Sequence, residues 1–314
     1  MEKFELSLGS ENEEICTHPG FVDELCIKCR LHVQDDSAIP LKYIHKNLRI
    51  AKDEMTRLRD KGFEDLVCLK KKLYLVLDLD HTLLDSVMLT SIEEEEEQFI
   101  DQRDSLLDTW KSNLFIPDKM ERMTKLRPFV HVFLEEASKL FEMYIYTTAT
   151  RGYALEMAEL IDPENKYFCS RIISRDDSTQ ENRKSLDIVL GRESAVLIVD
   201  DTKRVWENNL ENLIWIDEYE FFTSDYGESL FQRKTDEKER VLANVLKVLQ
   251  QVHTLFFDKE RKDNIKERDV RQGYVNNASN PHTVGEACDH KSGGANGESV
   301  DAPAKDVTRV RTRE

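Results

Sequence analysis

The sequence predicts an α/β fold built on a doubly wound parallel sheet. Two observations support this class. Four short runs are almost wholly apolar, as expected of strands buried on both faces, and they span residues 73–77, 141–146, 195–199 and 213–216. The segments between these runs show helical periodicity, so strands and helices alternate along the chain.

Three helices can be recognised by apolar residues at steps of three and four. Pro128 suits the first turn of one helix, whose stripe is Val130, Phe133, Leu134, Ala137 and Leu140. A second helix ends at Asp162–Pro163 and has the stripe Tyr153, Ala154, Met157, Leu160 and Ile161. A closing helix has the stripe Val241, Leu242, Val245, Leu246, Leu249 and Val252.

A long insertion follows the first strand and precedes Pro128. We expect a helical, acidic subdomain or flap there. The acidic run Glu93–Glu97 indicates a solvated loop and suggests no chemistry.

The body, predicted to span residues 69–256, is flanked by three other regions. Residues 1–40 form a short segment rich in cysteine and histidine, and residues 257–314 have the polar composition of a disordered tail. Between Leu41 and Arg59 apolar residues recur at alternating steps of three and four. This pattern predicts an amphipathic helix within residues 41–68 that lies on the body, because the repeat is too short for a coiled coil.

The composition of the chain argues against nucleic acid and membranes as direct partners. The 314 residues carry a net charge of −17, which argues against direct binding of nucleic acid. No stretch has the apolar length of a membrane span, and the N-terminus lacks a signal-peptide core, so we expect an intracellular protein without a membrane partner. We also expect it to be a monomer. In a reducing compartment, six cysteines indicate buried thiols or a metal site.

Polar side chains follow three of the predicted strands. Asp78 and Asp80 come after the first strand, Thr147 after the second, and Asp200 and Asp201 after the third. Ligands of an open α/β sheet bind outside the carboxyl ends of its strands. Four carboxylates at one edge need a cation, and oxygen ligands of this kind favour Mg²⁺.

This arrangement suits a two-step phosphoryl transfer. Asp78 can attack phosphorus as a nucleophile, while Asp80 donates a proton to the leaving alkoxide and later takes one from water. The hydroxyl of Thr147 and the ammonium of Lys184 can hold the phosphoryl oxygens. Each feature alone is more often a turn, a cap or a surface residue, but their order at one sheet edge favours catalysis.

The segment from Leu75 to Leu83, Leu-Val-Leu-Asp-Leu-Asp-His-Thr-Leu, resembles the signature of the haloacid-dehalogenase superfamily. Within it, the chain resembles the phosphatases of the RNA polymerase II C-terminal domain (CTD), of the TFIIF-associating and plant CTD-phosphatase-like type. Supporting motifs follow in order at Lys125–Pro128, Tyr146–Ala149, Lys184–Leu186 and Val199–Thr202.

The resemblance implies a role for each matching carboxylate. Asp78 would be nucleophile and Mg²⁺ ligand, and Asp80 would be the acid/base and bind the metal through its backbone carbonyl. Asp201 would ligate the metal directly, with Asp200 either a ligand through water or a partner of Lys184.

The resemblance also implies a substrate and further site residues. Thr147 and Lys184 would hold the transferring phosphate, Thr82 would orient the nucleophile loop at the substrate site, and Arg175 would position substrate. The substrate and partner would be the phosphorylated heptad repeats of the RNA polymerase II CTD, which places the protein in the nucleus.

Larger members of the resembled family carry a BRCT domain after the catalytic domain. Here the chain becomes polar and of low complexity beyond Arg268–Arg271, so we expect no BRCT domain in the tail. Two other readings remain open: the same chemistry on another phosphoprotein or a small phosphomonoester, and a non-catalytic binding form.

A second candidate metal site lies near the N-terminus. Cys26-Ile27-Lys28-Cys29 has the spacing of a zinc half-site, and Cys16 with His18 can supply the other two ligands. A structural Zn²⁺ and free thiols are equally compatible with this pattern.

Overall fold

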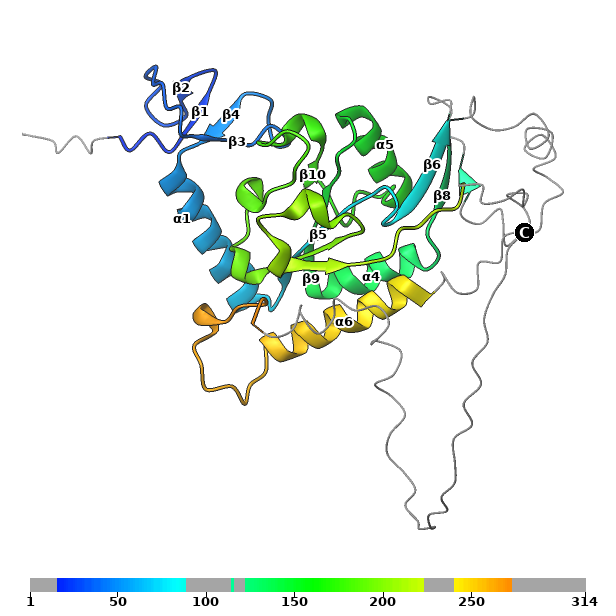
Figure 1. Cartoon of the computed structure of the whole chain (residues 1–314). Helices are drawn as coiled ribbons and strands as arrows, with labels where there is room; N and C mark the ends of the chain where they lie inside the picture. The colour runs from blue at the N-terminus through cyan, green and yellow to red at the C-terminus, as the bar shows by residue number, and fades with distance from the viewer. Residues whose placement is uncertain (1–15, 89–113, 116–121, 223–239, 273–314) are drawn as a thin grey trace, which may run out of the picture.

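The computed structural model describes residues 16–88, 114–115, 122–222 and 240–272 (Figure 1). Its centre is a five-stranded parallel sheet in the order β10-β9-β5-β11-β12. The strands are β5 (Leu73–Leu77), β9 (Phe141–Tyr146), β10 (Ile172–Ile173), β11 (Val196–Asp200) and β12 (Leu213–Trp215). The predicted α/β class and its four strands are confirmed, and β10 is a fifth strand, too short to show a pattern.

The predicted helices are confirmed as well. They are α4 (Val130–Leu140), α5 (Arg151–Ile161) and α6 (Val241–Phe256), and each buries its apolar stripe. Helix α4 packs along α6 at one side of the body (Figure 1). These stripes join the strands of the sheet in one hydrophobic core, and their burial stabilises the body.

The described part of the insertion differs from the predicted helix. It is a three-stranded antiparallel sheet of β6 (Leu84–Met88), β7 (Leu114–Phe115) and β8 (Arg122–Leu126), in the order β6-β8-β7. A regular ladder from Leu84 opposite Leu126 to Met88 opposite Arg122 satisfies the backbone of both long strands. The acidic run Glu93–Glu97 lies outside the described residues.

The predicted helix from Leu41 is wrong over its first part. Four short strands form an antiparallel N-terminal sheet in the order β2-β1-β4-β3, and α1 starts only at Lys52. The chain at Leu41–His45 makes turn hydrogen bonds instead, including His45 N to Leu41 O at 3.2 Å. Apolar residues such as Leu48 therefore have helical spacing in the sequence but lie in a paired strand in the structure. The elements are β1 (Gly20–Val22), β2 (Leu25–Cys26), β3 (Ile39–Pro40), β4 (Leu48–Ile50), α1 (Lys52–Gly62) and a π-helix (Phe63–Leu69).

The predicted disordered tail starts too early. Residues 257–272 are described and end in contact with the body, where Val270 is fully buried and its N–H donates to Ser194 O at 2.9 Å. The buried guanidinium of Arg268 donates to the carbonyl of Phe256 at the end of α6. The buried Val270 side chain and the buried Arg268 guanidinium can order a polar segment whose composition alone predicts disorder.

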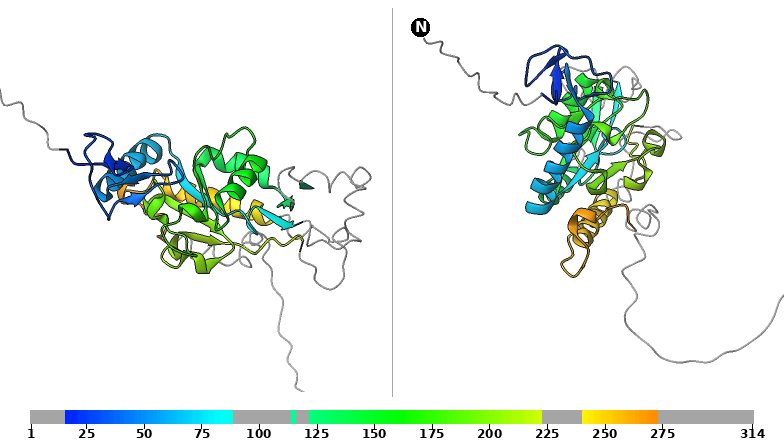
Figure 2. Two further views of the ribbon diagram at one scale, coloured as in Figure 1. Left: turned by 90° about the horizontal axis from the view of Figure 1, so that it is seen from above. Right: turned by 90° about the vertical axis from the view of Figure 1, so that its left-hand side faces the viewer.

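Two small sheets extend the body at opposite ends. Figure 2 shows the N-terminal sheet at one end and the β6-β8-β7 sheet at the other, with the parallel sheet between them. No helix among the described residues is long and apolar enough to span a bilayer.

Candidate active site

Three aspartates converge at the carboxyl edge of the central sheet. Asp78 directly follows β5, and Asp200 and Asp201 end and follow β11. These strands are neighbours, with Leu77 opposite Val199, so the carboxylates meet as the sequence predicts. One oxygen from each of the three lies within 4.8 Å of the others, and all three residues are buried. A buried all-oxygen cluster of this charge has the composition of a metal site for a hard cation.

Lys184 ties two of these carboxylates together. Its Nζ lies 2.6 Å from Asp78 Oδ1 and 2.6 Å from Asp200 Oδ2, and the side chain is almost completely buried. Burial alone lowers the pKa of Lys184, but the two carboxylates outweigh it and raise that pKa above its usual range. Burial and the Asp200 charge raise the pKa of Asp78. The lysine therefore stays charged, and the carboxylates around it still carry surplus negative charge.

The two neighbouring aspartates of β11 have different partners. Asp200 accepts from Lys184, from Trp206 Nε1 at 2.8 Å and from Thr202 N at 2.7 Å. Asp201 instead accepts from the hydroxyls of Thr82 and Thr202, each at 2.8 Å. Both aspartates therefore have both carboxylate oxygens hydrogen-bonded, and Asp200 is the one that holds Lys184.

Asp80 has a partner that the sequence did not reveal. The hydroxyl of Tyr153, on α5, donates a hydrogen bond to the Asp80 carboxylate and lies 3.0 Å from Ser86 Oγ. Burial raises the pKa of Asp80, which favours the protonated form that a general acid needs. Tyr153 was recognised only as part of the apolar stripe of its helix. Its hydroxyl shows how an aromatic residue can fill the core and still reach a polar site.

The loop after Asp80 is held by hydrogen bonds from Arg127 and Tyr219 to its backbone carbonyls. Arg127 is buried, and its Nη1 donates to Thr82 O at 3.1 Å while Nη2 donates to Asp217 O at 2.9 Å. Tyr219 N donates to His81 O at 2.7 Å, and His81 itself has a left-handed φ of 59°. Burial lowers the pKa of Arg127 to about 10, which leaves it charged at neutral pH. Its place in the Lys125–Pro128 motif was visible in the sequence, but its bonds to the loop were not.

The remaining predicted residues are placed as follows. Thr82 is fully buried, and its hydroxyl donates to Asp201 Oδ1 at 2.8 Å. Thr147 is buried at the end of β9, beside β5, and its Oγ1 accepts from Ala149 N at 3.0 Å. Arg175 is exposed and begins a short 3₁₀ turn. Its backbone N–H donates to Ala149 O, so this bond does not join it to the aspartate cluster.

The predicted zinc ligands also come together. Cys16, His18, Cys26 and Cys29 form the second cluster of metal-binding side chains among the described residues.

Comparisons with known proteins identify the family of the chain. Residues 73–259 match the NLI interacting factor-like phosphatase family, a range close to the predicted body at 69–256. RNA polymerase II C-terminal domain phosphatase-like 4 of Arabidopsis thaliana is 46% identical over 282 residues, 86% of this chain and 63% of that protein. Phosphatase-like 3 of the same plant is 34% identical over 243 residues, 72% of this chain and 19% of that protein.

A solved structure supports the fold. A variant of the fission yeast RNA polymerase II CTD phosphatase Fcp1, bound to beryllium fluoride, matches with a TM-score of 0.51 at 25% identity. The match covers 65% of this chain and 68% of that one, and it confirms the predicted haloacid-dehalogenase-like fold.

The chain spans less than two thirds of either plant relative. The family match nevertheless covers more than half of the chain, including the three aspartates and Lys184. The chain therefore belongs to the NLI interacting factor-like phosphatase family, and the plant relatives it matches are named RNA polymerase II C-terminal domain phosphatase-like.

Proposed function

We propose that this chain is a Mg²⁺-dependent serine/threonine protein phosphatase that works through an aspartyl-phosphate intermediate. The observation that supports it best is the pairing of Asp78, at the end of a central strand, with a buried lysine 2.6 Å away and Asp201 close by. The lysine and a divalent cation together would offset the charge of a bound phosphate, while Asp78 remains an available nucleophile.

The reaction runs in two steps. In the first, an Asp78 oxygen attacks phosphorus, the bond from phosphorus to the serine oxygen breaks, and Asp80 gives its proton to the departing alkoxide. In the second, the Asp80 carboxylate takes a proton from water, whose oxygen attacks phosphorus and releases Asp78 and inorganic phosphate. Lys184 and Thr147 hold phosphoryl oxygens in both steps, with Lys184 held in turn by Asp200.

The residues present fit Mg²⁺. Asp78, Asp201 and the backbone carbonyl of Asp80 would hold the ion, with Asp200 adding a contact through water, and the bound ion would neutralise charge on the phosphoryl oxygens. Zn²⁺, the other predicted cofactor, belongs with the thiols of the N-terminal cluster rather than with these carboxylates.

The substrate we propose is phosphoserine in the heptad repeats of the RNA polymerase II CTD, which implies a nuclear enzyme. The support comes from the relatives, which are named for this activity. Hydrolysis of a phosphorylated heptad-repeat peptide in Mg²⁺ tests the proposal. Turnover of p-nitrophenyl phosphate without turnover of the peptide would indicate another substrate, and turnover of neither would refute the enzyme proposal.

Removing the metal should abolish activity. We expect excess EDTA to lower peptide hydrolysis by at least about 100-fold, because the bound cation offsets the charge of the transferring phosphoryl group. Added Mg²⁺ should restore the rate once Zn²⁺ has been returned to the N-terminal cluster, while Ca²⁺ in place of Mg²⁺ should not, since its longer and more flexible coordination misplaces the phosphoryl oxygens. Full activity in EDTA after dialysis against the chelator would contradict the metal requirement.

Tyr153→Phe should slow turnover with little effect on KM. The change removes only the hydroxyl that donates to Asp80. That hydrogen bond lowers the pKa of Asp80 against the larger effect of burial, so its loss should raise the pKa further. We expect kcat to fall by about 10-fold and the alkaline limb of the pH profile to move to higher pH. Tyr167→Phe is the matched control, and an unchanged pH profile in Tyr153→Phe would rule out a positioning role.

A further inference from the structure

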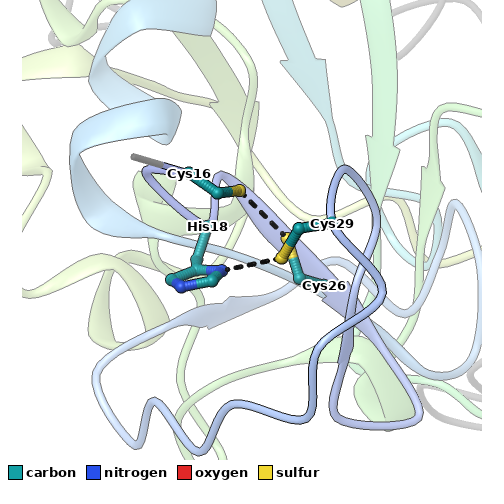
Figure 3. A group of neighbouring side chains, drawn as sticks. All are labelled: Cys16, His18, Cys26 and Cys29. Carbon is teal, nitrogen blue, oxygen red and sulfur yellow. Dashed lines mark hydrogen bonds between the residues drawn. The ribbon is translucent and has the colours of Figure 1, made fainter. Parts of the chain in front are cut away.

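The N-terminal cluster brings four side chains from one short segment to a common point. Figure 3 shows Cys16 and His18, which precede β1, facing Cys26 at the end of β2 and Cys29 in the turn that follows. Cys16 Sγ lies 3.8 Å from Cys26 Sγ, and Cys29 Sγ lies 3.4 Å from His18 Nδ1. All four ligand atoms lie within 4.8 Å of one another.

We propose that these four residues bind one structural Zn²⁺, which holds the N-terminal sheet together and in place on the catalytic body. Bonds of about 2.3 Å to sulfur and about 2.05 Å to nitrogen at tetrahedral angles put two sulfurs about 3.8 Å apart and sulfur and nitrogen about 3.5 Å apart. The observed separations of 3.8 and 3.4 Å agree with this geometry.

The backbone around Cys26 is shaped for a thiolate ligand. Lys28 N donates to Cys26 Sγ at 3.4 Å, and Arg30 N donates to Cys26 O at 3.0 Å. Arg30 adopts a left-handed φ of 63°, which lets the chain turn back past Cys29. An N–H group directed at a ligating sulfur supports its negative charge and fixes its direction, as outer contacts do at metal sites.

Disulfide bonds account for this cluster less well. A covalent sulfur–sulfur bond is about 2.04 Å long, far shorter than the 3.8 Å between Cys16 and Cys26. A disulfide bond would also leave the contact between His18 Nδ1 and Cys29 Sγ unexplained. Three sulfurs and one imidazole nitrogen are a common complete ligand set for structural zinc.

The β1–β2 end of the N-terminal sheet, which carries the four residues, buries little apolar surface of its own, and a bound ion would compensate for this. Its separate core consists of three buried residues: Phe21, Cys26 and Ala38. A segment this small cannot offset its conformational entropy through so few contacts, and small modules commonly use a metal for that purpose.

The same sheet contacts the segment that carries Lys184. Tyr43, just beyond β3, donates from its hydroxyl to Ile188 O at 3.0 Å, and Lys42 Nζ donates to Asp176 O at 3.3 Å. Pro19, next to His18, accepts at its carbonyl from Ala51 N at 3.1 Å, immediately before α1. Fixing His18 therefore fixes the start of α1 and the docking of the sheet beside the residues that flank Lys184.

The metal content of the purified full chain tests the proposal. We expect about one zinc per chain after gel filtration, and a loss of that zinc in Cys26→Ser and Cys29→Ser. Cys169→Ser and Cys68→Ser are matched controls that should keep it, since neither residue belongs to the cluster. Wild-type protein that lacks zinc, or Cys26→Ser that retains it, would overturn the proposal, as would an intact mass lower by two hydrogens per disulfide.

Two further measurements separate lost binding from lost folding. His18→Cys should keep one zinc, because a fourth thiolate completes the same tetrahedron. Its Co²⁺ form should show stronger sulfur-to-cobalt charge transfer than the wild-type Co²⁺ form. An identical spectrum would exclude His18 as a ligand. In folded wild-type protein, a chelator that removes zinc should expose residues 16–50 to protease while the body stays resistant, and unchanged resistance would refute the structural role.

Discussion

Asp78→Asn is expected to abolish phosphatase activity without loss of stability. Asparagine keeps the shape of the side chain but cannot form the acyl phosphate, so the rate should fall by at least about 10³-fold. Stability should hold because Asp78 and Asp200 share one lysine and repel each other, as the raised pKa of Asp78 indicates. Peptide hydrolysis and urea unfolding, both with matched protein concentration, measure the two effects.

The unfolding comparison should be made in EDTA, because Mg²⁺ bound to wild-type protein alone would add to its stability. In that condition the free energy of unfolding of Asp78→Asn should equal or exceed the wild-type value. Asp53→Asn, on the exposed face of α1, is the control that should leave both readouts unchanged. Residual activity within 10-fold of wild type would show that another group attacks phosphorus.

Lys184→Met should impair both activity and stability. The change removes the cation that contacts two buried carboxylates and, in our proposal, the phosphate. Breaking a buried ion pair by removing one partner costs about 3–5 kcal/mol, because the remaining charges are buried and uncompensated. Loss of a preorganised donor to the phosphoryl group should lower kcat by about 10²–10³-fold. Urea unfolding and steady-state kinetics measure the two losses.

A double mutant separates these two roles. Asp78→Asn combined with Lys184→Met removes one of the stranded charges, while Asp200 keeps its bonds from Trp206 and Thr202. The double mutant should be more stable than Lys184→Met by about 1–3 kcal/mol, yet remain inactive. Equal instability of the single and double mutants would show that Lys184 contributes packing rather than charge neutralisation.

The parts of the fold that were predicted correctly are those whose sequence pattern has one physical cause. Strands β5, β9, β11 and β12 are buried on both faces, so nearly all of their residues are apolar and the sequence pattern identifies them. The grouping of Asp78, Asp200 and Asp201 follows because the parallel neighbouring strands β5 and β11 end at one edge.

The parts that were missed depend on contacts between distant segments. Leu41, Ile44 and Leu48 have helical spacing, but Leu48 pairs in a strand whose partners lie elsewhere in the chain. Tyr153 fits an apolar helix stripe, and only the approach of its helix to the loop after β5 makes its hydroxyl a partner of Asp80. A one-dimensional pattern records burial, and it does not record which polar atom a buried side chain meets.

The sequence separation between the residues of each cluster affects the order in which the two clusters can form during synthesis. The Cys/His cluster closes within residues 16–29, whereas Lys184 meets Asp78 across 106 positions. Short loops cost less entropy to close, and contacts between distant segments form later. During synthesis the N-terminal cluster can therefore assemble while most of the body is still untranslated. Asp78 can meet Lys184 only after the chain has been made at least to residue 184, so a partly made chain would carry the proposed zinc site before the proposed nucleophile has its lysine.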